Sequence, residues 1–137
     1  MSEVIPKQRP EFRNIHISQI RSYRLPLAGR LSILHRVSGI LLFLAIPLVI
    51  LPLFERSLIS ELGFLEFKEI VGQWWVKIIL LGLIWGYLHH FTAGIRFLLL
   101  DLHIGIQKEA SRKSAVIVFG VSLALTALFG LKLFGVI

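Results

Sequence analysis

Three long apolar runs, separated by shorter polar stretches, dominate the pattern of the chain. A helix needs about 20 consecutive apolar residues to cross the hydrocarbon core of a bilayer, and each run is close to that length or longer. The predicted spans lie at residues 31–54, 74–100 and 114–137. Residues 55–73 and 101–113 are predicted loops, and Pro47 and Pro52 predict a kink near the end of the first span.

Composition agrees with this pattern. The chain has 137 residues, of which 55% are hydrophobic and 17% are charged, and its mean hydropathy is +0.79. A soluble domain of this length could not bury so much apolar surface, so the predicted class is all-α integral membrane. The absence of cysteine excludes disulfides, thiolate-held zinc or iron–sulfur sites and covalently attached c-type haem in this chain.

Positive charge is concentrated in residues 1–30 and in the second predicted loop. The formal net charge of +7 could suggest nucleic-acid binding, but this clustering is better explained as a topology signal. The positive-inside rule places the N-terminus and the second loop in the cytoplasm and the C-terminus outside. We therefore expect a cytoplasmic segment at 1–30 and a three-helix transmembrane domain at 31–137.

Glycine recurs every fourth residue around one histidine of the second span. Gly82, Gly86, His90 and Gly94 fall on one side of a helix, where small side chains leave a groove and the imidazole offers a metal-binding nitrogen. His90 lies ten residues before Leu100, roughly 15 Å at the helical rise, which is near mid-membrane. The row fits a haem held edge-on, or close helix packing through small residues.

Other polar residues in and around the spans have less specific predicted roles. His89 points about 100° away from its neighbour, so it cannot share that neighbour's role and is predicted to be structural. Arg96 and Asp101 are expected to orient the helix end and pair locally, and the arginine can snorkel. His16 and His103 lie in polar segments and are expected to be solvated.

A six-coordinate haem needs a second axial ligand. The third span contains no histidine or methionine, and the first offers only His35 near its start. A haem on His90 would therefore be five-coordinate or would take its other ligand from a partner chain. The chain also lacks a phosphate-cradling glycine loop, a nucleophile elbow and a carboxylate pair, so soluble-enzyme chemistry is not indicated.

Two stretches in this order resemble a known family: Ser32-Ile-Leu-His-Arg-Val-Ser-Gly39 and His90-x-x-x-Gly-Ile-Arg-x-Leu-Leu-Leu-Asp101. Together with Lys7-Gln-Arg-Pro10 and Tyr23-Arg-Leu-Pro26, they are similar to the cytochrome b membrane-anchor subunit of succinate dehydrogenase, or complex II. The resemblance covers nearly the whole chain. It implies half of a haem-binding helix bundle that a second small membrane subunit completes.

The resemblance also implies cofactors and partners. A flavoprotein with FAD oxidises succinate, an iron–sulfur subunit carries the electrons, and the two membrane subunits share haem b and reduce ubiquinone. Such a chain is a non-flavin subunit of the respiratory chain and the tricarboxylic acid cycle, without complete catalytic activity alone. We expect it in a bacterial cytoplasmic membrane, in contact with lipid and not with nucleic acid.

Site residues follow from the resemblance in the same way. His90 matches the haem axial ligand, Ser32 and Arg36 match quinone-site residues, and His35 with Arg36 matches groups that reach the haem propionates. The chain departs at Phe97, where some members have a histidine, so no role is carried over there. Without the resemblance, the arginine could equally bind lipid phosphate and the serine could cap the helix.

Two other functions compete with electron transfer. The chain could be a purely structural anchor for a peripheral enzyme, without functional haem. A small transporter component is a third possibility, which the lack of a broken repeat pair argues against. The sequence is compatible with both succinate oxidation and fumarate reduction.

Overall fold

The computed structural model describes residues 16–137. The N-terminal match Lys7-Gln-Arg-Pro10 and the basic residues of 1–15 lie outside the described residues. The described part is all helical. Its elements are α1 (Ile17–Ser22), α2 (Leu27–Ala45), the π-helix η1 (Ile46–Ile50), α3 (Leu51–Ile59), α4 (Glu61–Gly72), α5 (Trp74–Asp101) and α6 (Lys108–Leu133).

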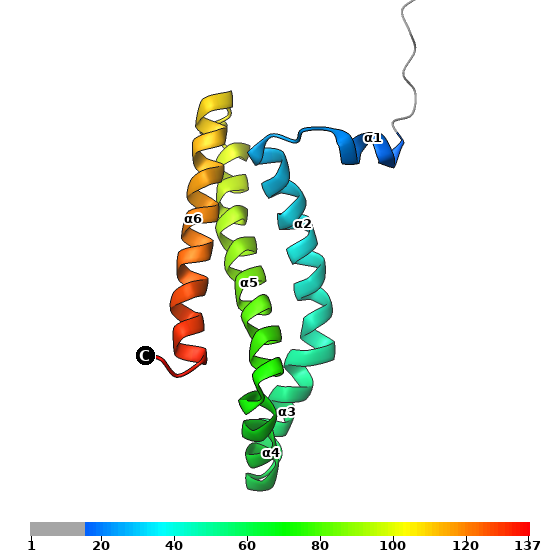
Figure 1. Cartoon of the computed structure of the whole chain (residues 1–137), viewed down its shortest axis with the longest axis vertical. Helices are drawn as coiled ribbons and strands as arrows, with labels where there is room; N and C mark the ends of the chain where they lie inside the picture. Colours follow the sequence, from blue (N-terminus) through cyan, green and yellow to red (C-terminus); the bar gives the residue numbers. More distant parts are fainter. Residues whose placement is uncertain (1–15) are drawn as a thin grey trace, which may run out of the picture.

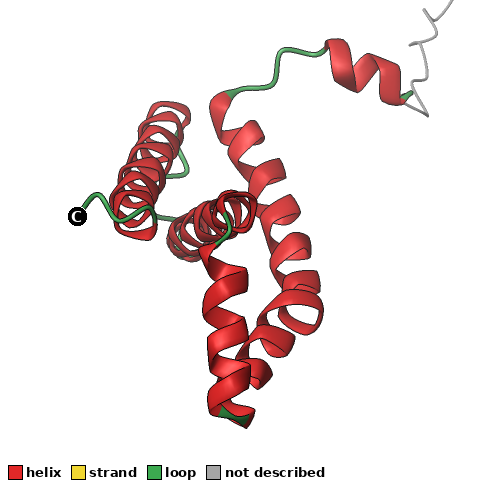
Figure 2. Cartoon of the chain, turned by 60° about the horizontal axis from the view of Figure 1, so that its bottom comes forward, coloured by secondary structure: helices red, strands yellow, loops and turns green. Residues whose placement is uncertain are grey.

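Three long helices run side by side, with α5 between α2 and α6 (Figures 1 and 2). Leu27–Ile59, Trp74–Asp101 and Lys108–Leu133 are each long and apolar enough to cross a membrane, which confirms the predicted fold class. The chain direction alternates from one long helix to the next, and short α1 projects to the side from the α2 end of the bundle (Figure 1).

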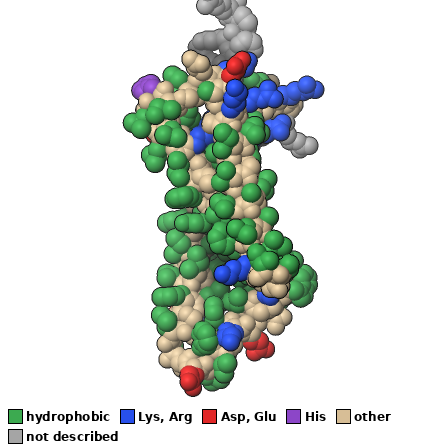
Figure 3. Space-filling view, turned by 90° about the vertical axis from the view of Figure 1, so that its left-hand side faces the viewer, with side chains coloured by type: hydrophobic (Ala, Val, Ile, Leu, Met, Phe, Trp, Pro, Cys, Tyr) green, Lys and Arg blue, Asp and Glu red, His purple; other side chains and the backbone are tan. Residues whose placement is uncertain are grey.

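Few side chains are buried inside this bundle. Leu31, Ala93, Ala115 and Val118 form its small core where the three long helices meet. Most large apolar side chains point outwards and remain exposed. The face seen from the α6 side is largely apolar along its length, and Lys and Arg side chains gather mainly near its two ends (Figure 3). Such a surface requires lipid or partner helices to cover it.

The first long helix is longer than its predicted span. It begins at Leu27, directly after Pro26, whose fixed φ suits the residue before a helix. The predicted distortion near Pro47 is present: residues Ile46–Ile50 adopt π-helical geometry. A proline lacks the N–H for its helical hydrogen bond, and the wider π turn accommodates that missing donor.

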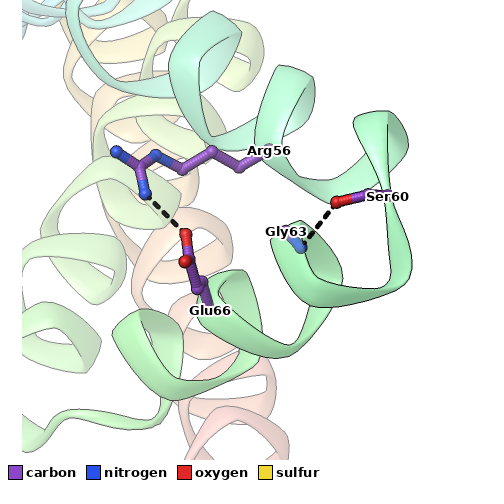
Figure 4. Close-up of polar contacts among 4 residues, drawn as sticks. All are labelled: Arg56, Ser60, Gly63 and Glu66. Carbon is purple, nitrogen blue, oxygen red and sulfur yellow. Dashed lines mark hydrogen bonds and ion pairs between the residues drawn. The ribbon is translucent and has the colours of Figure 1, made fainter.

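The prediction of a loop at residues 55–73 is wrong, because α3 extends into this segment and α4 fills most of it. Ser60 caps α4 by accepting a hydrogen bond from the Gly63 N–H at 3.0 Å, and Arg56 pairs with Glu66 at 3.0 Å (Figure 4). Charged residues interrupt the apolar run here, and a rule that counts apolar residues therefore predicts a loop. Ser60 followed by Glu61 is a helix-start signal that this rule overlooks.

Both remaining long helices end in a left-handed residue. After α5, the N–H of Ile104 bonds to Leu99 and that of His103 bonds to Leu100, with His103 at φ 62°. The α6 terminus repeats this pattern with Gly135 at φ 72°. The second loop is shorter than predicted because α6 begins at Lys108, and the turn at Gly135 ends the third helix before the last residues of the chain.

Candidate functional site

The imidazole of His90 is held by the main chain of α2. Its Nδ1 lies 3.0 Å from the carbonyl oxygen of His35. A carbonyl can only accept, so Nδ1 must carry the proton and donate. In a neutral ring the other nitrogen, Nε2, then keeps its lone pair. This is the arrangement of metal-binding histidines, whose second nitrogen commonly donates to a carbonyl or carboxylate.

Ser38 is part of the same hydrogen-bonded group, and sequence reasoning missed it. Its hydroxyl donates to the His35 carbonyl oxygen at 2.9 Å, and its Oγ lies 3.3 Å from Nδ1 of His90. The side chain is only 3% exposed. The sequence signal that could have indicated Ser38 is a hydroxyl residue inside an apolar span, one helical turn after His35.

A second histidine stacks on the first. The rings of His35 and His90 have centroids 4.1 Å apart and planes 4° apart. The His35 ring also contacts the Phe97 ring, with the two planes tilted by 50° and the centroids 5.0 Å apart. Phe97, the position at which the sequence departs from the pattern it resembles, therefore places an aromatic ring against His35 of the predicted site.

Close approach of α2 and α5 depends on glycine at one position. A Cβ atom built at Gly39 would lie 2.9 Å from Cε1 of His90, and one at Gly94 would lie 3.6 Å from Nε2 of His35. Gly82 and Gly86, by contrast, face open space. The glycine that meets the imidazole therefore comes from the neighbouring helix and not from the predicted glycine row.

Two hollows lie beside α2. The first, of about 440 Å³, is lined by two histidines, an arginine and apolar residues: His35, Arg36, Gly39, Ile40, Phe43, Leu44 and His90. The second, of about 460 Å³, is almost wholly apolar and includes Gly82 and Gly86 in its lining. Ser32 is half-buried one turn before Arg36 and lines neither of them.

His89 is isolated from this site. It is fully buried on the α6 side of α5, between the rings of Trp85 and Phe119, each with its centroid 5.3 Å away. Neither ring nitrogen has a hydrogen-bond partner, although the backbone of Leu31 approaches the ring. The predicted separation of His89 from His90 is what the helix geometry produces.

Arg96 is buried and does not snorkel. Its Nε donates to Ser114 Oγ at 2.9 Å, and one terminal nitrogen donates to Ser111 Oγ at 2.8 Å and to its carbonyl at 3.2 Å. The guanidinium thus joins α5 to the first turns of α6. Asp101 is exposed at the end of α5, and His16 and His103 are exposed as expected.

The first hollow combines groups suited to one kind of ligand. It offers an oriented imidazole lone pair, an exposed guanidinium and apolar walls, which together fit a flat apolar ring carrying a metal and anionic substituents. Within residues 16–137, no three His, Asp or Glu side chains come together as a metal site. The hollow opens at the surface of the bundle, so a second chain could complete it.

Comparison with known proteins agrees with the resemblance. The sequence model of the family "Succinate dehydrogenase/Fumarate reductase transmembrane subunit" matches residues 6–129. The chain is 32% identical over 111 residues to the succinate dehydrogenase cytochrome b556 subunit of Coxiella burnetii, covering 81% of this chain and 89% of the relative. It is 33% identical over 109 residues to the subunit of that name from Paracoccus denitrificans, covering 80% and 83%.

Proposed function

The chain belongs to the family of succinate dehydrogenase/fumarate reductase transmembrane subunits, and from this premise we propose that it binds haem b through His90 and helps to reduce ubiquinone. It is a multi-pass membrane protein and a membrane-anchor subunit of complex II. Its proposed role is to pass electrons from succinate oxidation, carried out by peripheral subunits, to quinone.

One observation carries the haem assignment. The hydrogen bond from His90 Nδ1 to the His35 carbonyl makes Nε2 the nitrogen that presents a lone pair for ligation, on the wall of a hollow. Gly39 supports it, because a side chain there would displace the imidazole. The residues present therefore fit a haem iron, and a bound haem would supply one-electron redox chemistry.

Further contacts of the haem would come from this chain and from a partner. Arg36 and the imidazole of His35 line the same hollow as His90 and are the groups proposed to hold the propionates. Within residues 16–137, no imidazole faces His90 from across the hollow, since the lining residues other than His35, which stacks on His90, and Arg36 are apolar or glycine. The second small membrane subunit is therefore the proposed source of the other axial ligand.

Ubiquinone reduction is assigned to Ser32 and Arg36. They lie one helical turn apart on α2, at the end of the bundle where the basic residues of α6 also begin. Reduction builds negative charge on the quinone oxygens, which a hydroxyl donor and a fixed guanidinium stabilise in a low-dielectric site. The iron–sulfur subunit, fed by the flavoprotein with FAD, would deliver electrons from this side.

Orientation and location form part of the same proposal. The N-terminus and the α5–α6 loop lie in the cytoplasm, the C-terminus lies outside, and the membrane is the bacterial cytoplasmic membrane. Reporter fusions after Ile137 should behave as extracytoplasmic, and fusions near Lys108 as cytoplasmic. The reverse pattern would contradict the quinone-site placement as well.

An absorbance spectrum of the purified membrane complex tests the haem assignment. Sharp reduced b-type bands are expected, and His90→Ala should remove them or convert the low-spin spectrum, because the iron loses its ligand. His89→Ala is the matched control and should leave the spectrum largely intact. A complex that assembles without haem, or one in which His89 proves essential, would instead favour a purely structural anchor or a different ligand.

A further inference from the structure

We propose that the side chain of His35 is a positioning residue that sets the plane of the His90 imidazole. This inference rests on the proposed ligation of haem by His90. It assigns to the His35 ring a role separate from any contact with propionate, namely to fix the rotation of the ligand ring about its own bond.

The hydrogen bond at Nδ1 orients the ring plane but leaves it some freedom to rock. Nδ1 lies off the Cβ–Cγ axis, so its bond to the His35 carbonyl restricts rotation about χ2, whereas the χ2 torsion itself has no sharp staggered minimum that would narrow the plane further. A flat neighbour in parallel contact restricts that rotation. The His35 ring is such a neighbour, at 4.1 Å and 4° from parallel.

The His35 ring is in turn held by α5 itself. It lies between His90 and Phe97, which are two helical turns apart on α5, and its Nε2 lies close to Gly94. A ring from α2 is thus inserted between two rings of α5. Phe97 offers no hydrogen bond, so its contribution to this stack is its shape.

The plane of an axial imidazole affects the haem measurably. It determines how the ligand orbitals overlap with the iron orbitals, and groups around a ligand tune a metal site through its orientation. In the low-spin ferric state the g values in electron paramagnetic resonance depend on the mutual orientation of the axial rings. These values therefore report the plane of His90, which mere loss of stability would leave unchanged.

Three variants of His35, made in the assembled complex, separate its two roles. His35→Phe keeps a flat ring and loses the polar nitrogens, His35→Gln keeps a polar group and loses the ring, and His35→Leu loses both. The main-chain carbonyl remains in all three. We expect the largest g value to stay at its wild-type position in the Phe variant and to shift beyond its linewidth in the Gln and Leu variants.

The opposite pattern would overturn the proposal. If Gln preserves the wild-type g values while Phe shifts them, His35 acts through a polar contact, and unchanged values in all three variants exclude any role for its ring. Phe97→Leu tests the stack where His35 variants do not retain haem, and a smaller shift in the same direction is expected; an unshifted signal contradicts the stack. If His90→Ala retains the low-spin spectrum, the haem assignment itself fails, which is a separate outcome.

Discussion

Gly39 on α2 faces His90 on α5 so closely that a Cβ atom at residue 39 would lie 2.9 Å from Cε1 of the imidazole. Ordinary carbon–carbon contacts are about 3.5–4.0 Å, so a methyl group there requires movement of the ring or of the helix. This contact makes the backbone of α2 part of the wall behind the proposed haem ligand.

Gly39→Ala should therefore reduce haem content in the purified complex. Overpacking of this kind costs about 1–3 kcal/mol, and here the cost falls on the position of the ligand ring. The ratio of haem to protein, measured from the reduced b-type absorbance, is expected to fall severalfold. Gly120→Ala is the control, because that α6 glycine has open space around it and should leave haem content unchanged.

Gly63 has a similar constraint outside the proposed site. A Cβ atom there would lie 2.6 Å from the backbone oxygen of Arg56, and backbone cannot rotate away as a side chain can. We expect Gly63→Ala to destabilise the α3–α4 hairpin by about 1–3 kcal/mol, which outweighs the gain in helix propensity.

Limited proteolysis of the complex measures this effect, because a loosened hairpin is cleaved faster between α3 and α4. Gly72→Ala is the matched control in the same helix, since no atom lies near its Cβ position. Equal cleavage rates for both variants would contradict the close contact. The ion pair of Arg56 and Glu66 is half exposed and should contribute less than about 1 kcal/mol.

The burial of His89 without hydrogen-bond partners predicts that an apolar residue is better there. A buried polar group left unpaired costs about 1–3 kcal/mol, and neither ring nitrogen of His89 is paired. His89→Leu should raise the thermal unfolding temperature of the complex and leave the haem spectrum unchanged. A lowered unfolding temperature would mean that the imidazole has a partner, with the Leu31 backbone as the first candidate.

The bilayer explains why much of the fold could be predicted from the sequence. Length and apolarity alone specify a membrane-spanning helix, so the three long helices were found without knowledge of their contacts. The α3–α4 hairpin was missed because that rule does not apply to a short helix with charged residues. Its cap at Ser60 is a local signal that apolar-run counting ignores.

The candidate site could be predicted only in part, for a different reason. Position along one helix made His90 a candidate ligand and the family resemblance favoured it, whereas its partners depend on how α2 is rotated against α5, which periodicity does not specify. The sequence could mark Ser38 as a polar residue inside an apolar span, but its contact with His90 and that of the His35 carbonyl could not be anticipated. For the same reason, Gly82 and Gly86 belong to a different hollow although they share a helix face with His90.

The last prediction concerns the two residues assigned to quinone. Arg36→Lys keeps the positive charge but loses the planar guanidinium with its several donors, and Ser32→Ala removes the hydroxyl. Loss of one donor aimed at developing negative charge costs about 10²–10³ in rate at preorganised sites. We expect succinate-driven ubiquinone reduction to fall by at least an order of magnitude in each variant.

Electron transfer from succinate to a soluble acceptor should survive in both variants, because it ends at the peripheral subunits. Arg30→Lys is the matched control: this arginine is also exposed, but it lies six residues earlier and so on another face of α2. Haem content must be measured in parallel, since Arg36 is also proposed to hold a propionate. If both variants assemble with normal haem and reduce ubiquinone at the wild-type rate, the quinone site lies elsewhere, and the arginine acts through lipid phosphate. Helix capping, the other role considered for Ser32, is wrong, because α2 begins at Leu27 and places this serine inside the helix.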